Sequence, residues 1–436
     1  MSAEAGTEYV WKPPQYSFDQ QPTLRGTTSV SQTLDKDDGN FTRTAKWCPD
    51  GSSLLLHCEN RSFELLPTPS YSAGPTHDGV KATAPSSISS PTLVHAQPAP
   101  ILDFTWYPGA TAQSPETHCF LASVRECPVK LLDASSVRLR ASYKIVDHRE
   151  RQIAPHSLAF NISATSIYCG FEDAIEVFDL MVPGEGTRLA TTPSKKSKDG
   201  LKGIVSALAF CPSYGSDLFA AGTLSPQEGN IALFREVDGE VPVAFLGGGP
   251  RAGVTQLHFN PMQPHLLYAA HRRRPEILCW DLRGDMARPL AALADPAAAP
   301  PPARTNQKLR FDIDITGRWL GTGDPAGQLL VYDLAAAGEP QNGAETIGVA
   351  PVCKVDAHGD AVGSVAFHPT QPIIATASGS RHFDAQDDSS ASESSSDDEE
   401  STVVRRKVGS GRTIGAGPRT RDASIKFWDA GGTGGN

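Results

Sequence analysis

Short apolar segments separated by turn residues recur along most of the chain. Seven of them end in an aromatic or apolar residue followed closely by Pro, Gly, Ser or Thr: KWCPDG (46–51), FTWYPG (104–109), LAFNIS (158–163), LAFCPS (208–213), LHFNPM (257–262), FDIDITG (311–317) and VAFHPT (365–370). Their anchor residues, from Trp47 to Phe367, stand 49–59 residues apart. Regular spacing of this kind indicates one repeat fold rather than several unrelated domains.

Each turn leads into a second apolar segment, and a third segment often ends in an aromatic residue and Asp. Two repeats carry the literal pair Trp-Asp, at Trp280-Asp281 and at Trp428-Asp429. Strand, turn, strand, loop and aromatic-Asp strand in this order are typical of WD-repeat blades. We therefore predict an all-β fold, a seven-bladed WD-repeat β-propeller over residues 41–430.

Two parts of the chain fall outside this regular repeat. Residues 1–40 form an N-terminal segment, part of which we expect to supply the strand that closes the last blade. Residues 380–420 form an insertion within the last blade that is first acidic and Ser-rich and then basic. Residues 384–400 hold eight acids and almost no apolar side chain, so burial cannot repay the entropy of ordering and we expect disorder.

The same insertion carries candidate phosphorylation sites. Ser394, Ser395 and Ser396 each precede an acidic residue by three positions, which suits an acid-directed kinase of the casein kinase 2 type. We hypothesise that the insertion, made more negative by phosphate, folds over basic loops and competes with polyanions. The alternative is a solvated spacer with no regulatory role.

Charge and cysteine content narrow the class of protein. The 436 residues carry a net charge of −10, and without the eight acids of 384–400 the 39 bases would face only 41 acids. The eight cysteines form no CxxC pair and no zinc-finger spacing, so we expect reduced thiols and no metal site. We find no secretory signal and no apolar stretch of the ~20 residues that a membrane helix needs.

No motif points to catalysis. GTGDPAG (321–327) contains G-x-G-x-x-A, but a strand-like segment follows it where a dinucleotide site needs a helix. The sequence holds no P-loop, no G-x-S-x-G and no H-E-x-x-H. We therefore expect a protein that is not an enzyme and that holds no cofactor.

Basic residues gather in loops that the blade pattern brings to one face. In WD blades the loops before the first strand and those between the second and third strands share one face, here named the top face. Loops of this face carry His271, Arg272, Arg273, Arg274, Arg125, Arg251, Asn306, Gln307, Lys308 and Arg310. A single basic loop is most often a solvated surface. Several on one rim favour a surface that binds the phosphates of a nucleic acid or of a phosphorylated partner.

Five further residues have a structural interpretation. His358 precedes a first strand, where WD blades often place a His that hydrogen-bonds toward the Trp-Asp strand. Trp280, Asp281, Trp428 and Asp429 form the two Trp-Asp pairs and are expected to stabilise their own blades.

The linker phrases add a resemblance to a known family. FTRTAKWCPDGSS (41–53), FLGGGPRAGVTQLHFNP (245–261), EILCWDLR (276–283) and TNQKLRFDIDITGRWL (305–320) resemble the telomerase Cajal body protein 1 family of WD-repeat proteins, also known as the WD-repeat antisense-to-p53 type. The resemblance covers about residues 41–430, and we expect a fungal-type relative. It implies a non-catalytic nuclear propeller that assembles or localises small Cajal-body ribonucleoproteins, telomerase included.

The resemblance also implies partners for the basic residues. We expect a small nuclear RNA of the box type or telomerase RNA, together with ribonucleoprotein proteins and splicing factors, bound by a monomer in Cajal-body-like nuclear foci. Arg would bind a phosphate or a guanine edge and Asn or Gln a base edge, in a single-stranded loop. Since fungal relatives are connected with splicing, the alternative is a protein-interaction scaffold of the splicing machinery, linked to the U2 small nuclear ribonucleoprotein.

Overall fold

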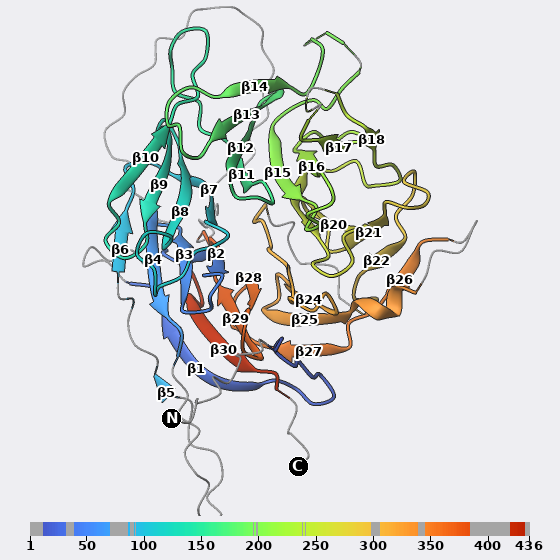
Figure 1. The fold of residues 1–436 in the computed structure, drawn as a ribbon. Coiled ribbons are helices and arrows are strands. Elements are labelled where there is room, and N and C mark those ends of the chain that lie inside the picture. The colour runs from blue at the N-terminus through green and yellow to red at the C-terminus, as the bar shows by residue number, and fades with distance from the viewer. Residues whose placement is uncertain are drawn as a thin grey trace, which may run out of the picture.

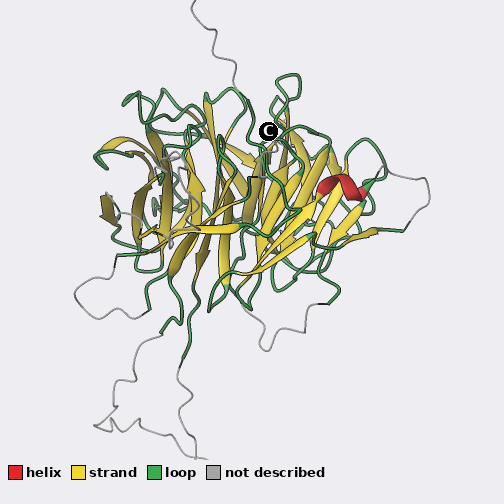
Figure 2. Cartoon of the chain, turned by 90° about the horizontal axis from the view of Figure 1, so that it is seen from below, coloured by secondary structure: helices red, strands yellow, loops and turns green. Residues whose placement is uncertain are grey.

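The computed structural model describes residues 12–31, 39–69, 86–87, 91, 93–194, 196–197, 199–237, 239, 241–297, 306–338, 345–383 and 419–431. It confirms the all-β, seven-bladed propeller, with seven sheets arranged around a central channel (Figure 1). Within these residues the only helix is one 3-10 turn, η1 (Leu334–Ala337), and no helix is long and apolar enough to cross a membrane (Figure 2).

Five blades are four-stranded antiparallel sheets. They are blade 1, β2 (Thr42–Trp47), β3 (Ser53–Cys58), β4 (Ser62–Pro67) and β6 (Leu93–Ala96); blade 2, β7 (Ile101–Trp106), β8 (Cys119–Val124), β9 (Val129–Asp133) and β10 (Leu139–Tyr143); blade 3, β11 (Ser157–Phe160), β12 (Ser166–Phe171), β13 (Ala174–Asp179) and β14 (Thr187–Ala190); blade 4, β15 (Val205–Phe210), β16 (Leu218–Thr223), β17 (Ile231–Arg235) and β18 (Ala244–Phe245); and blade 6, β23 (Asp312–Ile313), β24 (Trp319–Gly323), β25 (Gln328–Asp333) and β27 (Cys353–Asp356).

The other two blades carry a fifth strand that runs parallel to the fourth. They are blade 5, β19 (Val254–Phe259), β20 (Leu266–His271), β21 (Ile277–Asp281), β22 (Ala291–Leu293) and β26 (Ile347–Val349); and blade 7, β28 (Val362–Phe367), β29 (Ile373–Ser378), β30 (Ser424–Asp429), β1 (Thr23–Ser29) and β5 (Ser86–Ser87). In both blades the added strand covers a sheet edge whose backbone groups would otherwise stay unpaired.

Blade 7 is closed by the two ends of the described chain. Strand β1 pairs antiparallel with β30, from Thr23 opposite Asp429 to Ser29 opposite Ser424, and the two strands lie side by side in Figure 1. The Tyr16 hydroxyl lies 2.8 Å from the carbonyl oxygen of His368, to which it can donate. The ring of Tyr16 meets Phe367 edge-on at 5.0 Å, so the segment before β1 is also packed against this blade.

The second strands of the blades are mostly apolar because neighbouring blades cover both of their faces. All residues of β3, β8, β20 and β29 are buried. Outer strands such as β14 are mostly exposed or half-buried. The core therefore lies between the sheets, in clusters that join each blade to the next.

A ring of hydrogen bonds connects the first strands around the channel. In every blade one side chain of the first strand bonds the main chain of the next blade's first strand. The seven links are Lys46 Nζ to Phe104 O, Leu158 N to Asp103 Oδ2 (2.9 Å), Ser157 Oγ to Val205 O (2.9 Å), Ser206 Oγ to Val254 O (2.6 Å), Gln256 Nε2 to Phe311 O (2.7 Å), Phe367 N to Asp312 Oδ2 (2.8 Å) and Ala45 N to Ser364 Oγ (3.1 Å). Polar residues inside these strands thus hold the ring closed.

Candidate nucleic-acid interface

The basic run after β20 forms an exposed turn at the top of blade 5. Arg272, Arg273 and Arg274 are exposed, and Arg273 has a φ of 60° that tightens the turn. No carboxylate of the described residues lies within ion-pair distance of the three guanidinium groups. Their charge is therefore left for solvent or for a ligand. We name these three residues the arginine turn.

Asn306 anchors this turn. Its Oδ1 accepts hydrogen bonds from Arg273 Nε at 2.7 Å and from Arg272 Nη2 at 3.3 Å. The amide therefore fixes two arginines without neutralising them. Gln307, the next residue, instead donates from Nε2 to the carbonyl oxygen of Gly379 at 2.8 Å, which links the start of blade 6 to blade 7.

Lys308 and Arg310 lie at the top opening of the central channel. Arg310 donates from Nη1 to Thr255 O at 2.8 Å, and it lines the channel. Burial, followed by the nearby charge of Arg310, lowers the pKa of Lys308 to about 8. Arg272 also contributes to this shift, so the arginine turn and Lys308 are electrostatic neighbours.

Arg125 and Arg251 lie on the same face at different blades. Arg125 is exposed in the turn between β8 and β9, and both it and Lys308 lower the pKa of His156 after the larger effect of burial. Arg251 pairs with Glu228 at 3.3 Å, but the two side chains are 73% and 69% exposed, so this ion pair is worth little. The top face thus carries cations above several blades.

His271 lies inside blade 5 and not on its surface. The residue ends β20 and pairs with Val254 of β19, and it is buried. Neither ring nitrogen has a hydrogen-bond partner among the described residues. Burial, and then the charge of Arg274, lowers its pKa to about 4, so the ring is neutral at physiological pH. We therefore leave His271 out of the candidate interface.

The channel itself is a cavity of about 610 Å³ lined by the first strands of the blades. Lys46, Asp103, His258 and Asp312 line it together with Arg310. Lys46 lies 3.8 Å from Asp103, and burial lowers its pKa. Burial raises the pKa of Asp312 to about 7, even though Phe367 N donates to its carboxylate.

Sequence reasoning missed these channel residues although a signal was present. Lys46, Asp103, His258 and Asp312 each stand one or three positions before the anchor residue of their first strand. A polar residue at such a position must face either a ligand or a water-filled channel, because the other side of the strand is core. An alignment of the seven first strands, residue by residue, would have identified these four residues.

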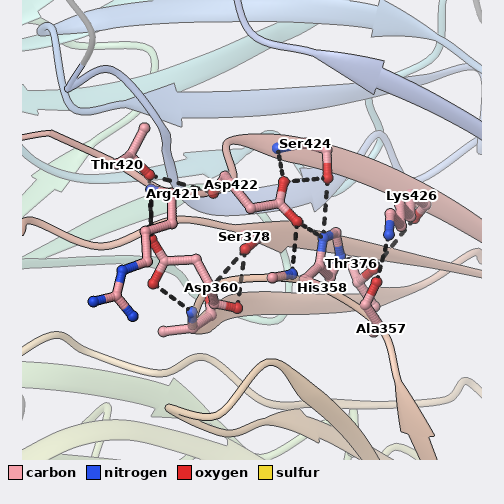
Figure 3. A network of polar contacts seen from close by, with 12 residues as sticks. Ala357, His358, Asp360, Thr376, Ser378, Thr420, Arg421, Asp422, Ser424 and Lys426 are labelled. Atoms are coloured by element: carbon pink, nitrogen blue, oxygen red, sulfur yellow. Dashed lines mark hydrogen bonds and ion pairs between the residues drawn. The ribbon is translucent and has the colours of Figure 1, made fainter.

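The residues with a structural interpretation lie within the blades. In blade 7 the His358 side chain is buried and lies 2.7 Å from Thr376 Oγ1 and 3.1 Å from Ser424 Oγ (Figure 3). Trp428 Nε1 donates to the same Thr376 oxygen at 2.9 Å. Asp429 pairs with Arg25 of β1. In blade 5 Trp280 donates to Gly247 O at 3.0 Å, and Asp281 pairs with Arg283 at 2.8 Å.

Asp360 joins the two ends of the insertion in blade 7. Its carboxylate accepts from Ser380 Oγ at 2.6 Å, from His382 Nε2 at 2.9 Å and from Arg421 N at 3.1 Å (Figure 3 shows Asp360 beside Arg421). Burial opposes ionisation, yet these hydrogen bonds lower the pKa of Asp360. Residues 384–418, with the predicted phosphorylation sites Ser394, Ser395 and Ser396, lie outside the described residues.

No family model matches the chain, but known proteins match most of its length. The chain is 31% identical to telomerase Cajal body protein 1 of Homo sapiens over 88% of its own length and 64% of the human protein, and 32% identical to the Bos taurus protein of that name over 84% and 63%. It is 26% identical to guanine nucleotide-binding protein negative regulator 1 of Schizosaccharomyces pombe over 68% and 72%. The chain thus spans less than two thirds of the two mammalian proteins.

Proposed function

Because this chain is a homologue of telomerase Cajal body protein 1 over most of its length, we propose that it is a nuclear, non-catalytic propeller that binds a small RNA and assembles or localises the resulting ribonucleoprotein. The RNA is of the small Cajal-body class or telomerase RNA. The interface is the arginine turn with Asn306, and Lys308, Arg125 and Arg251 extend it across the top face.

One observation carries this proposal: the arginine turn presents three guanidinium groups without an acidic partner among the described residues. Protein–RNA affinity comes largely from phosphate contacts, and such contacts need cations that are not already neutralised. The guanidinium group also binds phosphate through two parallel hydrogen bonds, which an ammonium group cannot do.

The anchoring amide gives the turn a preformed shape. Since Asn306 Oδ1 already accepts from Arg272 and Arg273, part of the entropy of ordering two long side chains is lost on folding and not on binding. Arg274 is not held by Asn306, so it remains free to follow the bound strand. A single-stranded RNA loop fits this surface best, because its phosphates and base edges are both accessible.

Salt titration of RNA binding tests the proposal. The full chain and the R272A/R273A/R274A variant are titrated with a small Cajal-body RNA, and log Kd is plotted against log salt concentration. We expect the variant to bind at least tenfold more weakly, with a salt slope reduced by about 2, because each lost phosphate contact removes about 0.7 from the slope.

The control variant is R288A. Arg288 is a half-exposed arginine in the loop between β21 and β22 of the same blade, where it already pairs with Asp285. It should bind RNA like the unaltered chain. Equal affinity and equal slope for R272A/R273A/R274A would contradict the proposed interface, and recovery of splicing proteins without any RNA would instead favour the scaffold function.

A further inference from the structure

Three cations converge at the top opening of the central channel. Lys46 comes from β2 of blade 1, whereas Lys308 and Arg310 come from the start of blade 6. Arg310 lowers the pKa of both Lys46 and Lys308, and all three lower the pKa of His57. Lys46 and Arg310 both line the channel cavity, and Lys308 lies two residues before Arg310. We name them the channel-mouth cations.

Few carboxylates balance the charge of these cations. The carboxylate of Asp103, opposite them in blade 2, is the anion that raises the pKa of all three. The Oδ2 atom of Asp103 is already bonded to Leu158 N. Asp312, which stands one residue before its anchor in β23 as Lys46 does in β2, has a pKa that burial raises to about 7, so it is partly protonated at neutral pH. The positive charge of the three cations is therefore only partly balanced.

The cations also have unused hydrogen-bond donors. Lys308 makes no hydrogen bond or ion pair with the residues that the structure describes. The Nε atom of Arg310 is buried and has no partner among those residues, and the same is true of Nδ1 of His258 on the channel wall. Buried donors without acceptors are costly, and they persist where a ligand or ordered water accepts from them.

The space in front of these donors is open. Blade 7 lies between blades 6 and 1, and its first strand lines the channel with the small side chains Ser364 and Ala366. The cavity of about 610 Å³ exceeds the volume of a phosphate group several times. Phe160 and Phe259, which also border the cavity, are buried in the apolar cores between the blades.

We propose that the channel-mouth cations bind the dianionic phosphate of a phosphate monoester carried by a nucleotide. This site deepens the proposed function, on which its link to RNA rests, but it differs from the arginine turn in residues and in ligand. A phosphate monoester carries close to two negative charges near neutral pH, so it can pair with cations that Asp103 alone does not balance. The cavity of about 610 Å³ leaves room for the attached nucleoside.

Calorimetric titration of the full chain with AMP tests the site, with adenosine as the uncharged control. We expect AMP to bind and adenosine not to bind. K308M should lower the affinity for AMP about tenfold, as the loss of one charge-assisted hydrogen bond predicts. R272A/R273A/R274A should leave AMP binding unchanged, because the arginine turn lies outside the channel.

A second variant predicts a gain. Asp103→Asn keeps an oxygen that accepts from Leu158 N but removes the nearby negative charge. AMP should therefore bind several-fold more tightly to D103N than to the unaltered chain. A role of these residues in folding alone would not raise affinity, so this variant separates ligand binding from structural support.

Proton uptake gives an independent readout. At pH 8 about half of the Lys308 side chains are neutral in the free protein, and a bound phosphate should return them to the charged form. Binding should then take up close to half a proton, measured from the heats in buffers with different ionisation enthalpies. K308R should bind AMP without this uptake, because arginine stays charged.

The two sources of a phosphate monoester are separated with short RNAs. Tighter binding of a 5′-phosphorylated strand than of its 5′-hydroxyl form, lost in K308M, assigns the site to an RNA end. Binding of AMP with no difference between the two strands assigns it to a free nucleotide. Absence of AMP binding, or equal AMP affinity in K308M, D103N and the unaltered chain, overturns the proposal.

The outcome also distinguishes this site from the proposed function. Failure of AMP binding with RNA binding still dependent on the arginine turn overturns the channel site alone. AMP binding without any RNA binding overturns the RNA-binding function and leaves the channel site as a nucleotide site.

Discussion

Blades 5 and 7 end in the same Trp-Asp pair but differ at their top ends. In blade 7 the buried polar groups bond one another: His358, Thr376, Trp428 and Ser424 form one network, and Asp360 accepts from several donors. In blade 5 the buried His271 has no partner among the described residues, and the arginines above it meet only an amide.

The surface charges follow the same division. On the side of blades 7 and 1, Arg43 and Arg381 both pair with Glu59. On the side of blades 5 and 6, the arginine turn and Lys308 have no carboxylate partner among the residues described. The Trp-Asp pair therefore predicts a strand but does not predict a hydrogen-bond network around it. The top of blade 7 is satisfied within the chain, whereas the top of blade 5 leaves cations and donors available to a ligand.

The largest effect is expected from Thr376→Val in blade 7. Valine removes the oxygen shared by His358 and Trp428 and leaves two buried nitrogens, Nε2 of His358 and Nε1 of Trp428, without this partner. Unfolding in urea should show a loss of about 2–4 kcal/mol in the free energy of unfolding. Thr376→Ser, which keeps the hydroxyl, should stay within about 1 kcal/mol. A loss below about 0.5 kcal/mol for T376V would mean that the network does not distinguish blade 7.

An intermediate effect is expected from Lys308→Met beside blade 5. The pKa of Lys308 is about 8 in the folded chain against 10.5 in the unfolded chain, so the unfolded chain binds more protons between these values. The charged lysine therefore costs stability below pH 8, and this cost disappears as the pH rises to 10.5. K308M should be more stable than the unaltered chain by about 1 kcal/mol at pH 7, because channel water screens part of the full shift.

The measurement is the difference in unfolding free energy between the two proteins from pH 7 to pH 10.5. It should shrink toward zero across this range. Lys354→Met is the control, because Lys354 pairs with Asp295 at 2.6 Å at the outer edge of blade 6 and should give no stabilisation at pH 7. A difference in unfolding free energy that does not depend on pH would contradict the lowered pKa of Lys308.

The smallest effect is expected from His271→Leu. Leucine fills the space of a buried ring that makes no hydrogen bonds, so stability at pH 7 should change by less than about 1 kcal/mol. The folded pKa of about 4 lies below the ordinary 6.5, so the unaltered chain should lose stability as the pH falls from 6.5 to 4. H271L should lack this loss in a urea series, and a large destabilisation at pH 7 would show that His271 has a partner after all.

The fold could be predicted from the sequence because it depends on periodicity. The first strands, their turns and the Trp-Asp strands alternate between core and channel or solvent, and this pattern survives differences in loop length. The covering strands β5 and β26 could not be predicted in the same way. They are two and three residues long, and their partners β1 and β22 lie 56 or more residues away in sequence, as Gly26 opposite Ser86 and Ala291 opposite Ile347 illustrate.

The candidate site was less accessible to sequence reasoning. The arginine turn was predicted to be an exposed top-face loop, and the structure has it so. His271 was included because it adjoins the arginines, but β20 extends through it and carries its side chain into the core. Arg310 was predicted for the rim and lines the channel instead, because it continues the line of the short strand β23 and bridges to Ser364. These positions depend on where each strand begins or ends. Hydrophobic periodicity predicts the ends of strands less well than their centres.

The pairing of β1 with β30 has a consequence for synthesis on the ribosome. Thr23 and Asp429 are partners across 406 residues, so translation at 5–20 residues per second leaves β1 without its partner for roughly 20–80 seconds. Throughout that time the nascent chain exposes an unpaired strand while the blades that follow are already being completed. Closure of the ring is therefore a late event, and chaperones that hold extended segments have their best opportunity at residues 23–29.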